Sequence, residues 1–326
     1  MAVKNLVDSQ SALEVARRAN NPDAFTIIET MAQSNTMLQE MPAIEANNNA
    51  IHNTLLRRSY PGGEHRIYNR GVGRRSSQTE PIEDRICMLE AFSDVDIDLA
   101  TQSGNPAALY QSEATAFLIG MGLDQADDLI YGNHATNPEE INGLAIRCSK
   151  AGDHCVPFTG KGKGLTSVYL VAAGVHGCHL IYPKGSNSVG VQRIDAGIMY
   201  VKDEDDAKKE FRVHRDHFKA DYGIVVAHPD AVIRICNIPP NMDKAQRAEL
   251  IEKILEFQKK LTIGLVNTVL FANQSMIYQI ERAGREAQYV VHPETDPWGK
   301  PVSSINGLRL RGQDAILFTE DEITAA

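Results

Sequence analysis

Two short stretches of the sequence carry residues that could bind phosphate or metal. Residues 160–164 (GKGKG) have the glycines of a phosphate loop, but Leu165 stands where such a loop needs lysine and then serine or threonine opening a helix. Residues 176–179 (HGCH) could ligate a metal. Neighbouring strand residues point to opposite faces, however, and structural zinc sites use two separated ligand pairs. We interpret the first stretch as a flexible surface loop and assign no metal to the second.

Three acids spaced by two, Asp94, Asp96 and Asp98, could form a ladder for a divalent metal. On a strand they would share one face about 6.6 Å apart, which is wide for a single ion. A solvated or arginine-paired face is the favoured interpretation. The sequence has no Gly-x-Ser-x-Gly nucleophile elbow and no serine in a distinctive context near a histidine. We therefore expect no catalytic residue, no metal and no cofactor, and the protein is not predicted to be an enzyme.

Charge is segregated between residues 55 and 98. Residues 55–79 hold six arginines and one acid, whereas residues 80–98 hold seven acids and one base. The basic half is rich in glycine and other turn formers and has no apolar face, so it is expected to lie on another copy of the chain. The predicted contact arginines are Arg57, Arg58, Arg66, Arg70, Arg74 and Arg75. The predicted acidic partner face is Glu83, Asp84, Glu90, Asp94, Asp96 and Asp98.

Two other interpretations of the basic half, residues 55–79, remain open. It could be a solvated loop with no specific partner, or it could touch nucleic acid. Only Tyr60 and Tyr68 are interleaved with the arginines, so a platform for stacking bases is disfavoured. The chain of 326 residues also carries a net charge of −9, which disfavours sequence-independent DNA binding by the whole protein.

Composition excludes further classes. No apolar run approaches the roughly 18–20 residues that span a bilayer, and the N-terminus has no apolar signal-peptide region. The five cysteines are few and irregularly spaced, which fits free thiols in a reducing compartment.

The elements that must position these residues are mixed without regular alternation, which predicts an α+β fold. The strongest helix is predicted over 106–131, with Asn105 as N-cap, Pro106 in the first turn and Gly132 as a left-handed C-cap. Gly120 and Gly122 inside it indicate close packing. Residues 1–50 are predicted to be a loosely organised arm. The other predicted elements are helices at 10–18, 24–33, 243–261 and 274–282, alternating strands over 82–99, a hairpin tip at 203–206, and strands at 167–173, 179–182, 197–201, 210–217, 222–227, 232–236, 266–271, 303–310 and 315–318.

The order of these elements resembles a known family over residues 55–318. The stretches that carry the likeness are 167–171 (SVYLV), 181–186 (IYPKGS), 231–238 (AVIRICNI), 298–302 (WGKPV), 305–311 (INGLRLR) and 314–317 (DAIL). They resemble the major capsid protein of tailed double-stranded-DNA bacteriophages, with the Hong Kong 97-like fold, in the branch of short-tailed phages. One departure is that the asparagine-arginine pair often found before the C-terminal helix is reduced here to Asn273.

The resemblance implies an architecture. Residues 1–50 would be the N-terminal arm and 51–98 the E-loop with its flanking strands, a loop that reaches a neighbouring subunit. Residues 99–147 would form the P-domain with its spine helix at 106–131, 148–270 the A-domain, and 271–326 a C-terminal helix and strands that return to the P-domain.

It also implies a function without catalysis. Copies of the chain would assemble as hexamers and pentamers into an icosahedral shell around the phage genome, in the virion capsid, after assembly in the host bacterial cytoplasm. The implied partners are the chain itself, scaffolding, portal and decoration proteins, and packaged DNA contacted non-specifically, with no membrane. Two alternatives stay open: an encapsulin-type nanocompartment shell, which has the same fold, and a soluble enzyme of unrecognised type.

Overall fold

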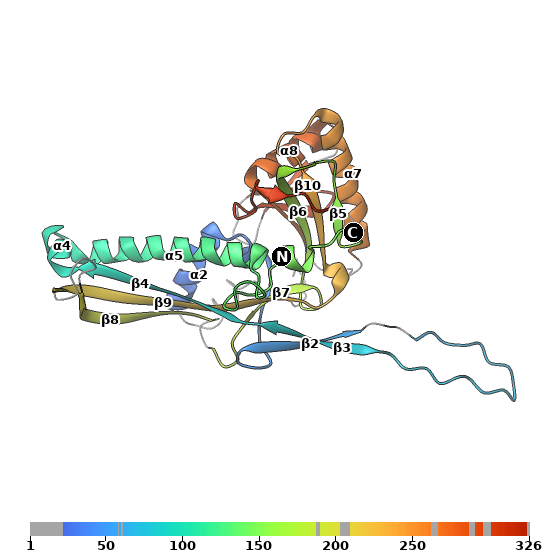
Figure 1. Cartoon of the computed structure of the whole chain (residues 1–326), viewed down its shortest axis with the longest axis horizontal. Helices are drawn as coiled ribbons and strands as arrows, with labels where there is room; N and C mark the ends of the chain where they lie inside the picture. Colours follow the sequence, from blue (N-terminus) through green and yellow to red (C-terminus); the bar gives the residue numbers. More distant parts are fainter. Residues whose placement is uncertain are drawn as a thin grey trace, which may run out of the picture.

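Three parts of the molecule extend in different directions (Figure 1). A long horizontal arm carries the longest helix, an upright lobe stands above one end of it, and a narrow hairpin projects away from both. The computed structural model describes residues 22–326 except 58, 60, 187–189, 203–208, 262–266, 287–290, 296–300 and 325–326. The predicted helix at 10–18 and the predicted hairpin tip at 203–206 lie outside the described residues.

The arm is built on helix α5, Pro106–Tyr131, with the bounds predicted from the sequence. Asn105 caps it by accepting a hydrogen bond from the Ala108 N–H at 3.2 Å, and Pro106 occupies the first turn. The prediction of a left-handed C-cap was wrong, because Gly132 has φ −45°. Glycine is needed there for space instead, since a Cβ would lie 2.7 Å from the carbonyl oxygen of Ile141.

A three-stranded antiparallel sheet lies beneath α5, formed by β4 (Cys87–Asp96), β9 (Glu210–Val226) and β8 (Val191–Lys202). The rings of Phe117 on α5 and Phe218 on β9 stack with centroids 6.4 Å apart. We predicted two strands at 210–217 and 222–227, but β9 is one continuous strand of 17 residues. Its even-numbered residues from 214 to 222 share the face that packs on α5. Pairing with β4 continues through residues 218–221 and pairing with β8 through residues 218–220, so the strand is not interrupted there.

The last part of the predicted 82–99 alternation was wrong. Asp96 ends β4 and caps a short helix, α4 (Ile97–Gln102), by accepting hydrogen bonds from the N–H groups of Asp98 and Leu99. Asp98 therefore lies on a helix. The three spaced acids do not share one strand face.

The central sheet joins the arm to the upright lobe. Its remaining strands are β1 Ala43–Glu45, β5 Cys155–Pro157, β6 Lys163–Ala173, β7 Cys178–Tyr182, β10 Val232–Ile238, β11 Asn267–Ala272, β12 Val291–Thr295, β13 Pro301–Ile305, β14 Leu308–Gly312 and β15 Glu320–Asp321. The main path runs β12-β13-β14-β11-β6-β7-β9-β4, while β10 and β15 pair with β6, and β1 pairs with β7. Because β9 pairs with both β7 and β4, one strand belongs to the lobe and to the arm.

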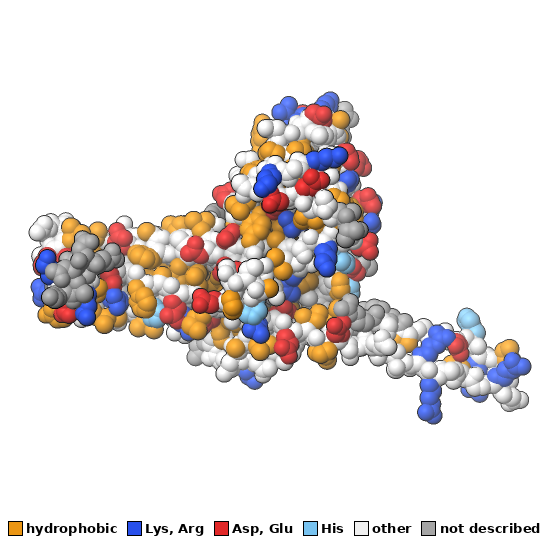
Figure 2. Space-filling view, viewed as in Figure 1, with side chains coloured by type: hydrophobic (Ala, Val, Ile, Leu, Met, Phe, Trp, Pro, Cys, Tyr) orange, Lys and Arg blue, Asp and Glu red, His pale blue; other side chains and the backbone are white. Residues whose placement is uncertain are grey.

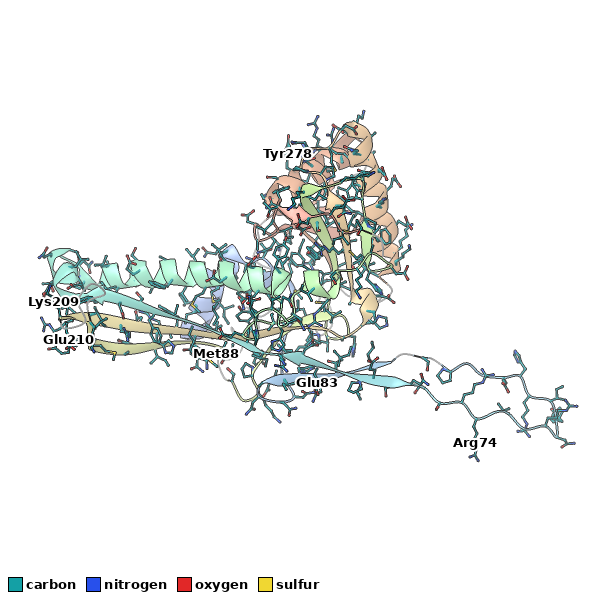
Figure 3. The ribbon with its side chains drawn as sticks, in the orientation of Figure 1. Arg74, Glu83, Met88, Lys209, Glu210 and Tyr278 are labelled. Atoms are coloured by element: carbon teal, nitrogen blue, oxygen red, sulfur yellow. The ribbon has the colours of Figure 1, made fainter. Side chains whose placement is uncertain are left out.

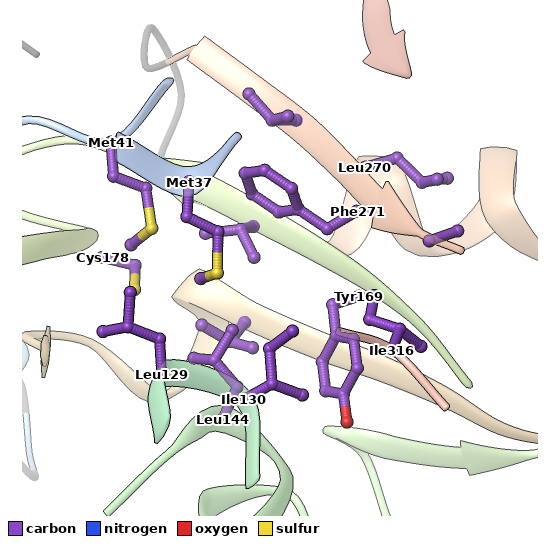
Figure 4. Close-up of a cluster of buried hydrophobic side chains, with 14 of the residues drawn as sticks. Met37, Met41, Leu129, Ile130, Leu144, Tyr169, Cys178, Leu270, Phe271 and Ile316 are labelled. Atoms are coloured by element: carbon purple, nitrogen blue, oxygen red, sulfur yellow. The ribbon is translucent and has the colours of Figure 1, made fainter. Parts of the chain in front are cut away.

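The core sits where α5, β6 and β11 meet (Figure 4). Tyr169, Leu170 and Phe271 are at most 1% exposed, and Leu129 from α5 is fully buried. Helices α7 (Lys244–Lys260) and α8 (Gln274–Glu286) cover the lobe, and α6 (Leu144–Arg147) and a 3₁₀ turn (Pro229–Ala231) lie in its connections.

Much of residues 22–46 packs into this core, so this part of the predicted loose arm (residues 1–50) is well organised, whereas residues 1–21 lie outside the described residues. Helix α2 (Pro22–Ser34) lies against α5, and α3 (Met37–Glu40) follows it. Met31, Met37 and Met41 are each at most 1% exposed. Burial of each such side chain stabilises the fold by about 1.5–3 kcal/mol. Gly122 permits the close approach of α2, because a Cβ there would lie 2.8 Å from the Met31 carbonyl oxygen.

The chain beyond α8 differs from prediction in two places. The predicted strand at 303–310 is a hairpin of β13 and β14 turning at Asn306 and Gly307, which both have positive φ. Residues 315–318 are not a strand, and among the described residues after α8 the pairing with β6 is made at β15. Among the described residues, no helix has the length and apolar character needed to cross a membrane.

Candidate assembly interface

The projecting hairpin consists of β2 (Ile51–Arg57) and β3 (Thr79–Arg85), paired antiparallel from Ile51 opposite Arg85 to Arg57 opposite Thr79. Beyond the last pair, the described residues 59 and 61–78 form a loop without strand pairing, and every side chain from 61 to 79 is exposed. Ile67 is 70% exposed and Tyr68 is 95% exposed. The loop therefore contributes nothing to the core of its own subunit, and its basic side chains line it on the outside (Figure 2).

The predicted contact arginines lie along this loop. Arg57 is the last residue of β2, and Arg58 lies outside the described residues. Arg66 donates from Nε to the Arg70 carbonyl at 2.9 Å, so these two residues brace the loop tip. Arg75 forms an ion pair with Glu64 across the loop.

Arg74 points away from the rest of the molecule (Figure 3). No acid among the described residues lies within ion-pair distance of Arg66, Arg70 or Arg74. The loop as a whole therefore keeps most of its positive charge uncompensated.

The base of the hairpin is fixed by a buried ion pair. Asp84 on β3 is 4% exposed at its side chain and accepts from Arg147 Nη2 at 2.5 Å. Arg147 also donates to the carbonyl oxygens of Asn142, at 2.9 Å, and Ile224, at 3.1 Å. Since the arginine comes from α6, this pair sets the direction in which the hairpin leaves the body.

The acids of β4 are paired within their own chain. Asp94 receives two hydrogen bonds from Arg215 of β9, at 2.6 and 2.5 Å. Glu90 lies 3.1 Å from His217 Nε2 and 3.9 Å from Lys219 Nζ. The β4–β9 register places Asp94 opposite Arg215 and Glu90 opposite Lys219, which confirms the arginine-paired interpretation for Asp94.

The other predicted acids are divided. Asp96 caps α4, Asp98 lies 3.8 Å from Arg212, and Asp84 holds Arg147. Glu83 on β3 is exposed, with no ion-pair partner among the described residues. Acids that are already neutralised attract a neighbour's arginines weakly. The predicted acidic partner face therefore keeps only Glu83 as a carboxylate without a partner of its own.

A different acidic surface, missed by sequence reasoning, lies on α5. Its exposed residues follow helical spacing along one stripe, here called the spine stripe: Glu113, Ala116, Ile119, Leu123, Asp124 and Asp127. No base among the described residues forms an ion pair with Asp124 or Asp127. Burial, Glu140 and Asp124 all raise the pKa of Asp127. The run Asp124-x-x-Asp127-Asp128, with no lysine or arginine on the helix, was the sequence signal that could have revealed it.

The phosphate-loop candidate is a surface loop followed by a strand, as expected. The Gly162 N–H donates to Glu322 Oε2 at 2.7 Å, and β6 begins at Lys163. Cys178 and His179 are consecutive residues of β7, and both are buried.

The described residues thus combine an exposed basic loop with an acidic stripe on a long helix. Comparisons with known proteins identify the family of the chain. The family model of the major capsid protein GP7 matches residues 19–324. The chain belongs to the major capsid protein GP7 family. It is a structural component of a virion capsid and not an enzyme.

One solved structure shares the fold over most of its length, and two others match less well. The chain is similar to a chain of bacteriophage Epsilon15, at 24% identity and TM-score 0.63, over 87% of this chain and 88% of that one. It also matches the bacteriophage JBD30 capsid at 11% identity and TM-score 0.46, over 86% and 91%. An encapsulin of Synechococcus elongatus matches at 12% identity and TM-score 0.39, over 62% and 86%. A comparison with curated proteins finds no match. The predicted α+β, Hong Kong 97-like capsid fold is confirmed, and the family match favours a capsid protein over the encapsulin alternative.

Proposed function

We propose that this GP7-family capsid protein assembles by laying the basic loop of one copy, residues 58–78, along the spine stripe of the next. The observation that carries the proposal is the exposure of every side chain from 61 to 79. A segment of this length that buries no side chain within its own subunit becomes ordered only by packing on the surface of another molecule. In Figure 1 the loop points away from α5 of its own subunit, so the surface it meets belongs to another copy.

Charge and apolar character match between the two surfaces. Residues 61–78 contain four arginines and one glutamate, giving a net charge of +3. The spine stripe carries three carboxylates, from Glu113, Asp124 and Asp127. Beside the arginines the loop exposes Ile67 and Tyr68, and the stripe exposes Ile119 and Leu123, at 38% and 45%.

Each contact of this kind is weak alone. An exposed ion pair contributes about 0–1 kcal/mol, so a single loop would dissociate readily. In a closed ring every subunit gives one loop and receives another, and the contacts then act together. Such a head-to-tail interface closes into hexamers and pentamers when the rotation between copies allows it. We propose that these rings build an icosahedral shell around the phage double-stranded DNA.

Other partners belong to the same proposal. Scaffolding, portal and decoration proteins would act on the shell, and packaged DNA would be contacted non-specifically. The net charge of −9 supports weak rather than tight contact with DNA.

Charge reversal tests the loop. The triple variant Arg70→Glu, Arg74→Glu, Arg75→Glu is expected to prevent shell formation, seen by negative-stain electron microscopy and sedimentation, while circular dichroism stays that of the folded subunit. A matched control reverses three exposed lysines elsewhere, Lys150, Lys161 and Lys163, and should still assemble. Normal shells from the arginine triple variant would refute the role of the loop.

A charge swap tests the acceptor. The variant Asp124→Lys, Asp127→Lys is expected to block assembly alone and to restore it when combined with the arginine triple variant. If the loop variant fails to assemble but the helix variant forms normal shells, the role of the loop in assembly is supported and the spine stripe is not the surface that receives it.

A further inference from the structure

Three side chains capable of holding a metal ion meet between β8 and β9, on the face turned toward α5. They are Asp195, His214 and Asp216, and each offers one ligand atom within 4.8 Å of the other two. His214 and Asp216 are two residues apart on β9, so their side chains share a face. Asp195 stands opposite Asp216 in the ladder.

A β-bulge aims the aspartate of β8 into the cluster. The register shifts between Asp195 and Gly197, and Gly197 has φ +70°, a conformation that favours glycine. The Gly197 N–H donates to Asp195 Oδ1 at 2.8 Å and holds the carboxylate in place. Asp195 Oδ1 lies 3.3 Å from His214 Nε2, a separation normal for two atoms bound to one ion.

Packing holds the imidazole plane. The ring of Tyr110 on α5 stacks on His214, with centroids 4.4 Å apart and 16° between the planes. A stacked ring leaves the imidazole edge as the side available for ligation. The histidine therefore presents Nε2 along the sheet, where Asp195 lies.

The strongest indication of a cation site is a buried oxygen of Asp216 that has no hydrogen-bond partner among the described residues. Its side chain is 4% exposed, and Oδ2 accepts from Arg193 Nη2 at 2.7 Å. Oδ1 is also buried but has no hydrogen-bond partner among the described residues. A buried polar atom left unsatisfied costs about 1–3 kcal/mol, and more when charged. Arg193 balances one of the two carboxylates, so one negative charge remains to attract a cation.

We propose that Asp195, His214 and Asp216 bind one divalent transition-metal ion of the zinc type. Imidazole nitrogen with carboxylate oxygen suits Zn²⁺, whereas Mg²⁺ and Ca²⁺ prefer oxygen alone. Ligand distances of about 2.0–2.2 Å require only a small contraction of the cluster. Asp195 is exposed, so water completes the coordination. The ion ties the edge strand β8 to β9 across its bulge, a role independent of the loop contact.

Calorimetric titration of the untagged full-length chain, first treated with a chelator, tests the site. Zn²⁺ is expected to bind with one high-affinity ion per chain, and Mg²⁺ much more weakly. Asp195→Asn and His214→Gln should each weaken Zn²⁺ binding at least about tenfold, the scale seen even for residues that only support a metal ligand. Both positions lie at or near the surface, so both variants should keep the circular dichroism of the parent.

The matched control is His217→Gln, a histidine on β9 that faces the other side of the sheet and pairs with Glu90. It should bind Zn²⁺ as the parent does. Absence of stoichiometric Zn²⁺ binding by the parent chain would overturn the proposal. So would equal affinity for Mg²⁺, or unchanged affinity in the Asp195 and His214 variants.

Discussion

Replacing Glu320 by alanine is expected to destabilise the fold strongly, although the residue lies on a strand of only two residues. Its side chain is 8% exposed and joins three parts of the molecule. It pairs with Arg234 of β10 at 3.0 Å, accepts from the Tyr131 hydroxyl of α5 at 2.7 Å, and accepts from Ser167 of β6. The spine helix and the lobe are therefore tied through one carboxylate.

The size of the loss follows from what remains after the substitution. Arg234 is 6% exposed at its side chain and would keep the Ser167 hydroxyl at 2.9 Å and the carbonyls of Ala145 and Cys148 at 3.3 Å. Its charge would stay buried without a counter-ion. Breaking a buried pair from one side costs about 3–5 kcal/mol, and solvent screening is small at this burial. We expect Glu320→Ala to lower the free energy of unfolding by that amount.

Urea unfolding of unassembled subunits measures this change, and the neighbouring residue supplies the control. Asp321 pairs with Lys163 at 3.7 Å, and these side chains are 73% and 87% exposed. Asp321→Ala should therefore cost no more than about 1 kcal/mol. The double variant Arg234→Met, Glu320→Leu removes both charges and should be much milder than Glu320→Ala. If Glu320→Ala costs no more than Asp321→Ala, the buried pair does not hold the last strand and the reasoning fails.

Two glycines of α5 and one buried histidine give further predictions. Gly120→Ala should raise the thermal unfolding temperature, because a Cβ there meets nothing within 4 Å and alanine favours helix over glycine by about 1 kcal/mol. Gly122→Ala should lower the unfolding temperature, because its Cβ would overlap Ser34 Oγ and the Met31 carbonyl. Equal shifts would contradict the packing of α2. Burial, reinforced by a nearby histidine, lowers the pKa of His179 to about 4 from 6.5, so the unfolded chain takes up the proton first. Stability should fall by about 3 kcal/mol as the pH drops through that window. His179→Gln should remove that dependence in urea unfolding, and a slope equal to that of the parent would contradict the assignment.

The sequence predicted correctly those helices and strands whose bounds depend on residues close together in the chain. Asn105 and Pro106 mark the start of α5, and the helix begins and ends at the predicted residues. The strands at 167–173 and 232–236 were found because continuous apolar runs reflect burial on both faces.

Long-range packing decided the features that the sequence did not reveal. Residues 22–41 were expected to belong to a loosely organised arm, yet three methionines spaced along them are buried because α2 packs against α5 and β8. The pairing of Asp94 with Arg215 joins residues 121 positions apart and depends on the β4–β9 register. The basic loop was found by its composition, but its acidic counterpart on α5 was missed. Attention to the acids nearest in sequence favoured β4, whose charges β9 already neutralises.

The continuity of β9 has a mechanical consequence for the subunit. The strand spans about 57 Å and is bonded to β4 along ten residue pairs at one end and to β7 at the other. Tension along the arm therefore reaches the lobe through covalent backbone and loads the ladder in shear. In shear many hydrogen bonds resist together, whereas a pull at right angles to the sheet would open them one after another. A subunit built this way is stiff when it is stretched along the arm, and it yields most easily by peeling at the arm's free end.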